Sequence, residues 1–114
     1  GPASRVRRFT FRTDGFVSVH AAGQGSLLTK PLTFSGANLS MNIAARGSAR
    51  VELQDAAGKP LPGFALDDCS PITGDFIDHV VSWKGGADLG KVSGQPVRLL
   101  VVMKDTDLFS MRFQ

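Results

Sequence analysis

Hydrophobic and polar residues alternate at every second position along much of this chain. Over residues 50–54, Val51 and Leu53 alternate with charged or amide side chains, and residues 38–43 repeat the pattern. Residues 108–113 do so as well, with Phe109, Met111 and Phe113 in the apolar row. Such alternation places one row of side chains on a core and the other on water or a ligand, as in half-buried antiparallel strands. The more continuously apolar residues 97–103 predict a central strand covered on both faces.

Turn signals that contain glycine separate these runs at short intervals. They lie at Asp14-Gly15, residues 23–25, Ser35-Gly36, Arg46-Gly47, residues 57–58, 62–63 and 85–86, and Gly94. Glycine adopts positive φ angles at little steric cost, so these positions predict tight connections between strands. No stretch of ten or more residues has a convincing helical period. The pattern therefore predicts an all-β domain, an antiparallel β-sandwich or small barrel of about eight short strands.

Length and composition limit the number of domains and the classes of function. The 114 residues contain no internal repeat or linker, which predicts a single domain over residues 3–114. Gly1-Pro2 resemble the remnant of a cleaved purification tag and are set aside. The single cysteine, Cys69, excludes an internal disulfide and a Cys-rich zinc site. With two His, one Glu and no Tyr, the chain has few groups for acid–base catalysis, so we expect no enzyme and no catalytic residue.

The positive charge of the chain is concentrated in an N-terminal arm. The net charge is +3, but four arginines precede Asp14, and residues 13–114 hold nine basic against ten acidic residues. A nucleic-acid-binding domain carries its positive charge on a folded face, so we expect no nucleic-acid partner and interpret the arm as a solvated strand edge. No apolar run approaches the roughly 20 residues of a membrane span, so no membrane partner is expected either.

An acidic cluster around residues 67–78 has two interpretations. Asp67, Asp68, Asp75 and Asp78 fall within twelve residues, and Ca²⁺ takes six to eight oxygen ligands that an irregular loop can supply. The spacing does not match an EF-hand. Alternatively, the aspartates accept hydrogen bonds from their own backbone in turns. Ca²⁺ is thus the one candidate cofactor, with Asp67, Asp68 and Asp75 as candidate ligands, and no other cofactor is expected.

Trp83 is the best candidate for contact with a sugar. It ends an alternating run over residues 77–83 and precedes the flexible Lys84-Gly-Gly86. An exposed indole stacks well on the apolar C–H face of a sugar ring, whereas a lone Trp in a small β-domain can also belong to the core. His20 is interpreted as rim or core, and His79 as an inward, hydrogen-bonded residue. Cys69 has no evident base nearby, so a nucleophile is not expected.

Nine segments occur in an order that resembles one known family. They are Asp14-Gly-Phe-Val-Ser-Val19, Leu28-Thr-Lys-Pro-Leu-Thr-Phe34, Gly36, Leu39-Ser-Met-Asn42, Val51-Glu-Leu-Gln-Asp55, Gly58-Lys-Pro-Leu-Pro-Gly-Phe64, Asp68-Cys-Ser-Pro-Ile-Thr-Gly-Asp75, Trp83-Lys-Gly-Gly86 and Leu108-Phe-Ser-Met-Arg-Phe113. The family is the β-sandwich domain appended to the C-terminus of bacterial glycoside-hydrolase-like proteins, often after a five-bladed β-propeller of the glycosidase or sialidase type. The match covers residues 8–113.

This resemblance implies a non-catalytic accessory domain of jelly-roll type. Its expected partners are a carbohydrate and a parent catalytic domain in the same chain, in a secreted or cell-surface protein. The predicted sugar-binding residues are Trp83, Asp67, Asp68 and Asp75, with Arg98 or His20. The alternative is a structural module without a ligand, which packs against the catalytic domain through the acidic loop and residues 59–63. The ending Leu108-Phe-Ser-Met111 departs from a Leu-Tyr-Ser-Phe-like pattern, so we expect the terminal strand to serve the core.

Overall fold

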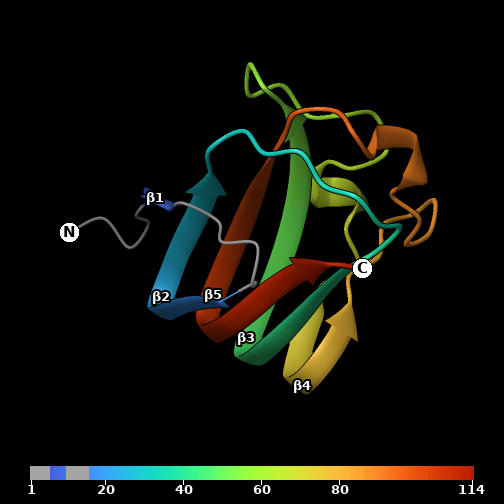
Figure 1. The fold of residues 1–114 in the computed structure, drawn as a ribbon. Coiled ribbons are helices and arrows are strands. Elements are labelled where there is room, and N and C mark those ends of the chain that lie inside the picture. The colour runs from blue at the N-terminus through green and yellow to red at the C-terminus, as the bar shows by residue number, and fades with distance from the viewer. Residues whose placement is uncertain (1–5, 10–15) are drawn as a thin grey trace.

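The computed structural model describes residues 6–9 and 16–114, so the turn predicted at Asp14-Gly15 lies outside the described residues. Five strands and two short 3₁₀ turns follow one another along the chain (Figure 1). They are β1 (Val6–Phe9), β2 (Phe16–Thr29), β3 (Leu39–Asp55), η1 (Leu66–Asp68), β4 (Ile72–Val80), η2 (Gly90–Val92) and β5 (Val97–Phe113). The strands form a single sheet in the order β1-β2-β5-β3-β4.

The prediction of an all-β domain is confirmed. Strands β2, β5, β3 and β4 pair antiparallel, and β1 adds to the edge of β2 in parallel. Within the described residues there is no α-helix. The structure shows five strands in one sheet, and it shows neither a sandwich of about eight strands nor a jelly-roll topology.

The strand count differs because two predicted turns lie inside long strands. Residues 23–25 are part of β2, and Arg46-Gly47 is part of the 17-residue strand β3. Likewise β5 continues from residue 97 to residue 113, which joins two strands that the sequence pattern separates. At both places the chain makes a β-bulge, which leaves the strand intact. Gly23 adopts a positive φ of 73°, as a turn glycine would, whereas Gly47 is required by the close approach of the Lys104 carbonyl.

Two β-bulges, one in β2 and one in β3, lie opposite Asp105 and set the shape of the sheet. Thr106 pairs with Ala21 on one side and Ala45 on the other, and Lys104 pairs with Gln24 and Ser48. Asp105 alone therefore faces two residues on each neighbouring strand. Bulges increase twist and bend a strand, and these two interrupt the pairing of β5 with both neighbours at the same level. Strands β2, β5 and β3 therefore all bend near their middle (Figure 1).

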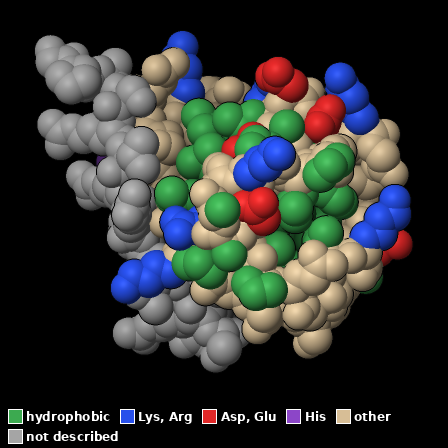
Figure 2. Space-filling view, turned by 90° about the horizontal axis from the view of Figure 1, so that it is seen from above, with side chains coloured by type: hydrophobic (Ala, Val, Ile, Leu, Met, Phe, Trp, Pro, Cys, Tyr) green, Lys and Arg blue, Asp and Glu red, His purple; other side chains and the backbone are tan. Residues whose placement is uncertain are grey.

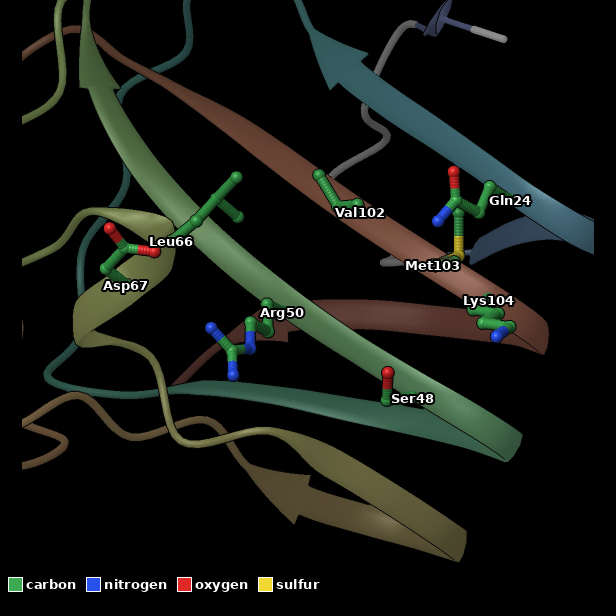
Figure 3. Close-up of a pocket in the computed structure, with 8 residues that line it drawn as sticks. All are labelled: Gln24, Ser48, Arg50, Leu66, Asp67, Val102, Met103 and Lys104. Atoms are coloured by element: carbon green, nitrogen blue, oxygen red, sulfur yellow. The ribbon is translucent and has the colours of Figure 1, made fainter. Parts of the chain in front are cut away.

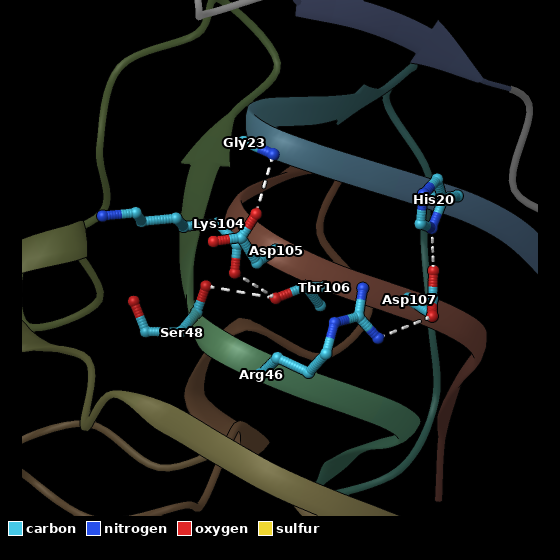
Figure 4. A network of polar contacts seen from close by, with 8 residues as sticks. All are labelled: His20, Gly23, Arg46, Ser48, Lys104, Asp105, Thr106 and Asp107. Atoms are coloured by element: carbon cyan, nitrogen blue, oxygen red, sulfur yellow. Dashed lines mark hydrogen bonds and ion pairs between the residues drawn. The ribbon is translucent and has the colours of Figure 1, made fainter.

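Local hydrogen bonds hold Asp105 in this conformation (Figure 4). Its φ of 47° lies in the left-handed region, which Asp tolerates better than most residues. Its Oδ1 accepts a hydrogen bond of 2.9 Å from the backbone N–H of Gly23 on β2. The Thr106 hydroxyl donates to the Lys104 carbonyl at 2.8 Å. Asp105 is thus tied to β2, and the Thr106 hydroxyl closes the backbone of β5 across it.

The core lies along the inner side of the bent sheet. Val51 and Leu53 are buried as the alternation predicts. The other buried hydrophobic residues on the three central strands are Ala21, Leu27, Leu39, Met41, Ile43, Ala45, Ala49, Val97, Leu99, Val101, Met103, Leu108 and Met111. On β5 the opposite face stays partly open, since Val102 is 37% exposed. The central position of residues 97–103 is confirmed, but the prediction that this strand is covered on both faces was wrong.

A further bulge, in β5, changes the prediction for Leu108 and Phe109 of the terminal strand. Ile43 pairs with Leu108 and Asn42 pairs with Ser110, so Phe109 is an extra residue without a partner in the β3 register. This shift buries Leu108 and leaves Phe109 exposed. Met111 is buried as predicted, and the ring of Phe113 stacks on Phe34 at 4.0 Å between centroids.

Replacing Gly47 by Ala should destabilise the domain by about 1–3 kcal/mol, the usual range for overpacking a close contact. A Cβ at this position would lie 2.4 Å from the backbone carbonyl oxygen of Lys104, so one of the two strands must shift. Gly85→Ala is the matched control, because a Cβ there has no neighbour within 4 Å. Urea unfolding of both variants measures the difference; equal midpoints would show that the bulge tolerates a side chain.

A charged group joins the three central strands beyond the bulge (Figure 4). Asp107 on β5 accepts a hydrogen bond from Arg46 Nη1 of β3 at 3.2 Å and also contacts Nδ1 of His20 on β2. The hydrogen bond from His20, and then that from Arg46, hold the pKa of Asp107 below its ordinary value. The ionised form is therefore the one that the folded state favours.

This lowered pKa predicts a loss of stability in acid. Ionised Asp107 stabilises the fold above its unfolded-state pKa of about 3.9, and the contribution disappears as pH falls through the folded-state value. Asp107→Asn should therefore lower the melting temperature at neutral pH, and the difference from wild type should shrink as pH falls through the folded-state pKa and the wild-type carboxylate becomes protonated. Thermal scans across this range provide the measurement, with the exposed Asp78→Asn as control. A constant difference between wild type and Asp107→Asn at all pH values would contradict the assignment.

Candidate functional site

The structure places Trp83 in the core. Its side chain is 3% exposed, and its Nε1–H donates a hydrogen bond of 2.9 Å to the Val51 carbonyl. The ring meets Phe64 edge-on, with 5.3 Å between centroids and 75° between planes. Stacking on a sugar requires a free ring face, which this position does not present. The core interpretation of Trp83 is the one that fits the structure.

The three aspartates of the predicted site lie on two different elements. Asp67 and Asp68 belong to η1, whereas Asp75 is an exposed residue of β4 opposite Ala44. Asp68 Oδ2 accepts a hydrogen bond from the Ala65 backbone at 3.2 Å, which is the turn-stabilising role considered above. In the described part of the chain, no group of three or more His, Cys, Asp or Glu side chains is arranged to hold a metal ion.

The remaining predicted residues lie on opposite sides of the bend. Arg98, near the start of β5, is half-buried and donates from Nε to the Ala56 carbonyl at 3.1 Å. His20 is exposed at the rim and contacts Asp107, as described above. Of the six predicted binding residues, Asp67 is the one that lines the cleft described below.

Cys69 is buried and His79 is half-buried, and for His79 the structure gives a ring contact rather than the predicted hydrogen bond. The Sγ atom of Cys69 accepts a hydrogen bond from the Val51 N–H at 3.3 Å, and burial raises the pKa of the thiol. A neutral thiol is a poor nucleophile, which agrees with the sequence interpretation. His79 is half-buried against the ring of Phe76, 4.6 Å between centroids, and burial lowers the pKa of its imidazole.

A shallow cleft of about 260 Å³ opens on the outer face of the bent sheet (Figure 3). Strands β2, β5 and β3 form its floor and η1 stands at its side. The lining residues are Gln24 from β2, Ser48 and Arg50 from β3, Leu66 and Asp67 from η1, and Val102, Met103 and Lys104 from β5. The cleft therefore combines apolar, amide, hydroxyl and charged side chains.

Strand register explains why these side chains meet. Arg50 pairs with Val102, and the next pair on the same face joins Ser48 to Lys104. On the other side of β5, Gln24 also pairs with Lys104. Side chains directly opposite on neighbouring strands lie about 4.5–5.5 Å apart at Cβ, and diagonal neighbours about 7–8 Å. The floor of the cleft is thus a small square of side chains with Arg50 and Lys104 at diagonal corners.

A buried carboxylate positions the wall of the cleft. Glu52 is buried on the outer face of β3, where its Oε2 accepts a hydrogen bond from Gln54 at 2.8 Å. Its Oε1 accepts one from the Leu66 backbone N–H at 3.2 Å, which attaches η1 to the sheet. Because Leu66 and Asp67 follow one another on η1, this bond also sets the place of Asp67.

The charged residues of the cleft have no ion-pair partner among the described residues. Within the part of the chain that the structure describes, the ion pairs join Asp107 to His20 and to Arg46, and Asp68 to Lys84. Arg50, Lys104 and Asp67 take part in none of them.

Sequence reasoning missed most of the cleft. Arg50 stands in the polar row of an alternating strand, a position expected to meet water or a ligand, and this was the one available signal. That Lys104 and Val102 share its face follows from pairing between residues about fifty positions apart, which local alternation does not specify.

In comparisons with known proteins, no family model, no curated protein and no solved structure matches this chain. In the described residues, no helix is long and apolar enough to cross a membrane.

Proposed function

We propose that this chain is a non-catalytic carbohydrate-binding domain, an accessory to a carbohydrate-active enzyme. Its proposed sugar site is the cleft over β2, β5 and β3 beside η1. One observation carries the proposal: Val102 and Leu66 offer apolar surface within the same cleft as Gln24, Ser48 and Asp67. A sugar presents apolar C–H groups beside hydroxyls that both donate and accept hydrogen bonds. Small-ligand sites have the same composition, an apolar wall with a few convergent polar groups.

Each side chain has a distinct role in this proposal. Val102 contacts the C–H face of the ring, while the Gln24 amide both donates to and accepts from hydroxyls. Asp67 accepts hydrogen bonds from hydroxyls, and the Arg50 guanidinium donates to them. At about 260 Å³ the cleft is smaller than the roughly 300–1,000 Å³ of typical ligand pockets, so it takes one sugar unit. Without an aromatic platform, we expect Kd on the order of 1 mM, about −4 kcal/mol.

The resemblance to accessory domains of glycoside-hydrolase-like proteins supports this choice of ligand. It also supports a secreted or cell-surface location and a catalytic domain in the same protein. The jelly-roll topology that the resemblance implies is not required, because the cleft lies on one face of a single sheet. Of the six predicted binding residues the proposal keeps Asp67 and gives up the other five, Trp83, Asp68, Asp75, Arg98 and His20.

Titration of the ¹⁵N-labelled domain with a panel of mono- and disaccharides tests the site. Binding should move the backbone amide signals of Gln24, Ser48 and Lys104, and Gln24→Ala or Val102→Asp should weaken the affinity at least tenfold. Gln95→Ala is the matched control, since Gln95 is exposed in a loop outside the cleft. A folded domain that binds no saccharide, or one whose signals move elsewhere, would refute the proposal.

A second candidate function, packing against a neighbouring domain, is favoured by the apolar surface. Strand β4 is an edge strand of the sheet and carries exposed Phe76, Ile77 and Val80, with Ile77 85% exposed.

A different surface lies at the end of the sheet where β3 stops and β5 starts, and there Leu32 bridges to Val97 and Pro60 to Gln54. Figure 2 looks onto this end, where hydrophobic side chains gather between charged ones. Interdomain contacts have this mixed polarity.

For this second candidate, Ile77→Lys is the decisive variant. In a protein that includes the adjoining domain, it should lower the melting temperature of that domain by several degrees, because a buried charge replaces an apolar contact. The melting temperature of the isolated chain should stay unchanged, since Ile77 is exposed there. Calorimetry of both forms separates the two effects, and an unchanged adjoining domain would exclude packing through β4.

A further inference from the structure

The charges in the cleft favour one class of sugar over the others. Arg50 and Lys104 bring two positive groups into the cleft, against the single carboxylate of Asp67. Neither cation has an ion-pair partner among the described residues, in contrast to Arg46, which Asp107 engages. Two cations without ion-pair partners, on the same cleft floor as the apolar side chain of Val102, suit an anionic ligand with a hydrophobic face.

We infer, on the basis of the proposed function, that the cleft selects a sugar that carries a carboxylate, such as a uronic acid. Arg50 and Lys104 stand at diagonal corners of the square formed by the pairs Arg50–Val102 and Ser48–Lys104. Diagonal neighbours lie about 7–8 Å apart at Cβ, within reach of long side chains, so both cationic groups can meet one carboxylate between them. The sugar ring then lies over Val102, with Ser48 beside it.

The two cationic side chains differ in shape, so each contributes differently to binding the carboxylate. A guanidinium binds a carboxylate with two parallel hydrogen bonds, which fixes the orientation of the ligand. The Lys104 ammonium is a compact charge that adds attraction without demanding one geometry. Met103, which also lines the cleft, is buried in the core through its side chain and contributes no competing charge.

Asp67 distinguishes a carboxylated sugar from other anions. Its carboxylate accepts hydrogen bonds from sugar hydroxyls, but it repels any anion that enters the cleft. This repulsion grows with the charge of the ligand, so it acts more strongly against a phosphate than against a singly charged carboxylate. The apolar side chains of Val102 and Leu66 likewise favour a ring with C–H groups over a small hydrated ion.

The experiment compares matched sugar pairs by calorimetry on the intact domain. Methyl glucuronoside and methyl galacturonoside should bind at least tenfold more tightly than the methyl glucoside and methyl galactoside, and 0.5 M NaCl should reduce the difference. Lys104→Gln should weaken uronoside binding at least fivefold. Asp67→Asn should strengthen binding of inorganic phosphate, which enters the wild-type cleft poorly. Lys91→Gln is the control, because Lys91 is exposed on η2 outside the cleft.

The possible failures are separable. If neither neutral nor acidic sugars bind, the proposed function fails together with this inference. If neutral sugars bind as tightly as uronosides, or if Lys104→Gln and Lys91→Gln behave alike, the inference is overturned while the proposed function stands. Inorganic phosphate that binds the wild type as tightly as a uronoside would also overturn it, because the cleft would then recognise charge without the sugar.

Discussion

The pair of bulges opposite Asp105 is the constraint on which the rest of this structure depends. A single residue faces two residues on each neighbouring strand, so three long strands must bend at one level. Without the bend, a sheet of only five strands would have no second layer to bury its apolar face. The bend lets the two halves of the same strands surround a shared core. Gly47 permits it, because the Lys104 carbonyl occupies the space of a side chain.

A second requirement arises where β3 runs past its neighbour β4. The pairing of these strands ends at Ala49 and Ile72, which leaves the backbone groups of Val51 in need of partners. Side chains supply them: the Trp83 indole donates to the Val51 carbonyl and the Cys69 sulfur accepts from its N–H. Satisfying buried backbone groups in this way explains why the only Trp and the only Cys are both buried.

The sequence predicts the all-β class and the buried rows, because alternation at Val51 and Leu53 reports directly which face meets the core. It does not predict strand length, since a glycine at a bulge and a glycine at a turn have the same local signature. Trp83 shows the same limit for the site. Its hydrogen-bond partner lies 32 residues away, so burial depends on a tertiary contact that no local pattern records. The cleft likewise depends on the register in which β2, β5 and β3 pair, because that register brings its lining residues together.

The outer face near the bend carries two kinds of charge with different consequences. Asp107 engages His20 and Arg46, so these charges hold β2, β5 and β3 together and are committed to the fold. Arg50 and Lys104, on the same three-stranded surface, have no such partner among the described residues, although Asp67 lines the same cleft. Exposed ion pairs contribute little to stability, so the fold does not require partners for these two cations. They stand next to the exposed side chain of Val102, and this arrangement is the one that the proposed binding site would use.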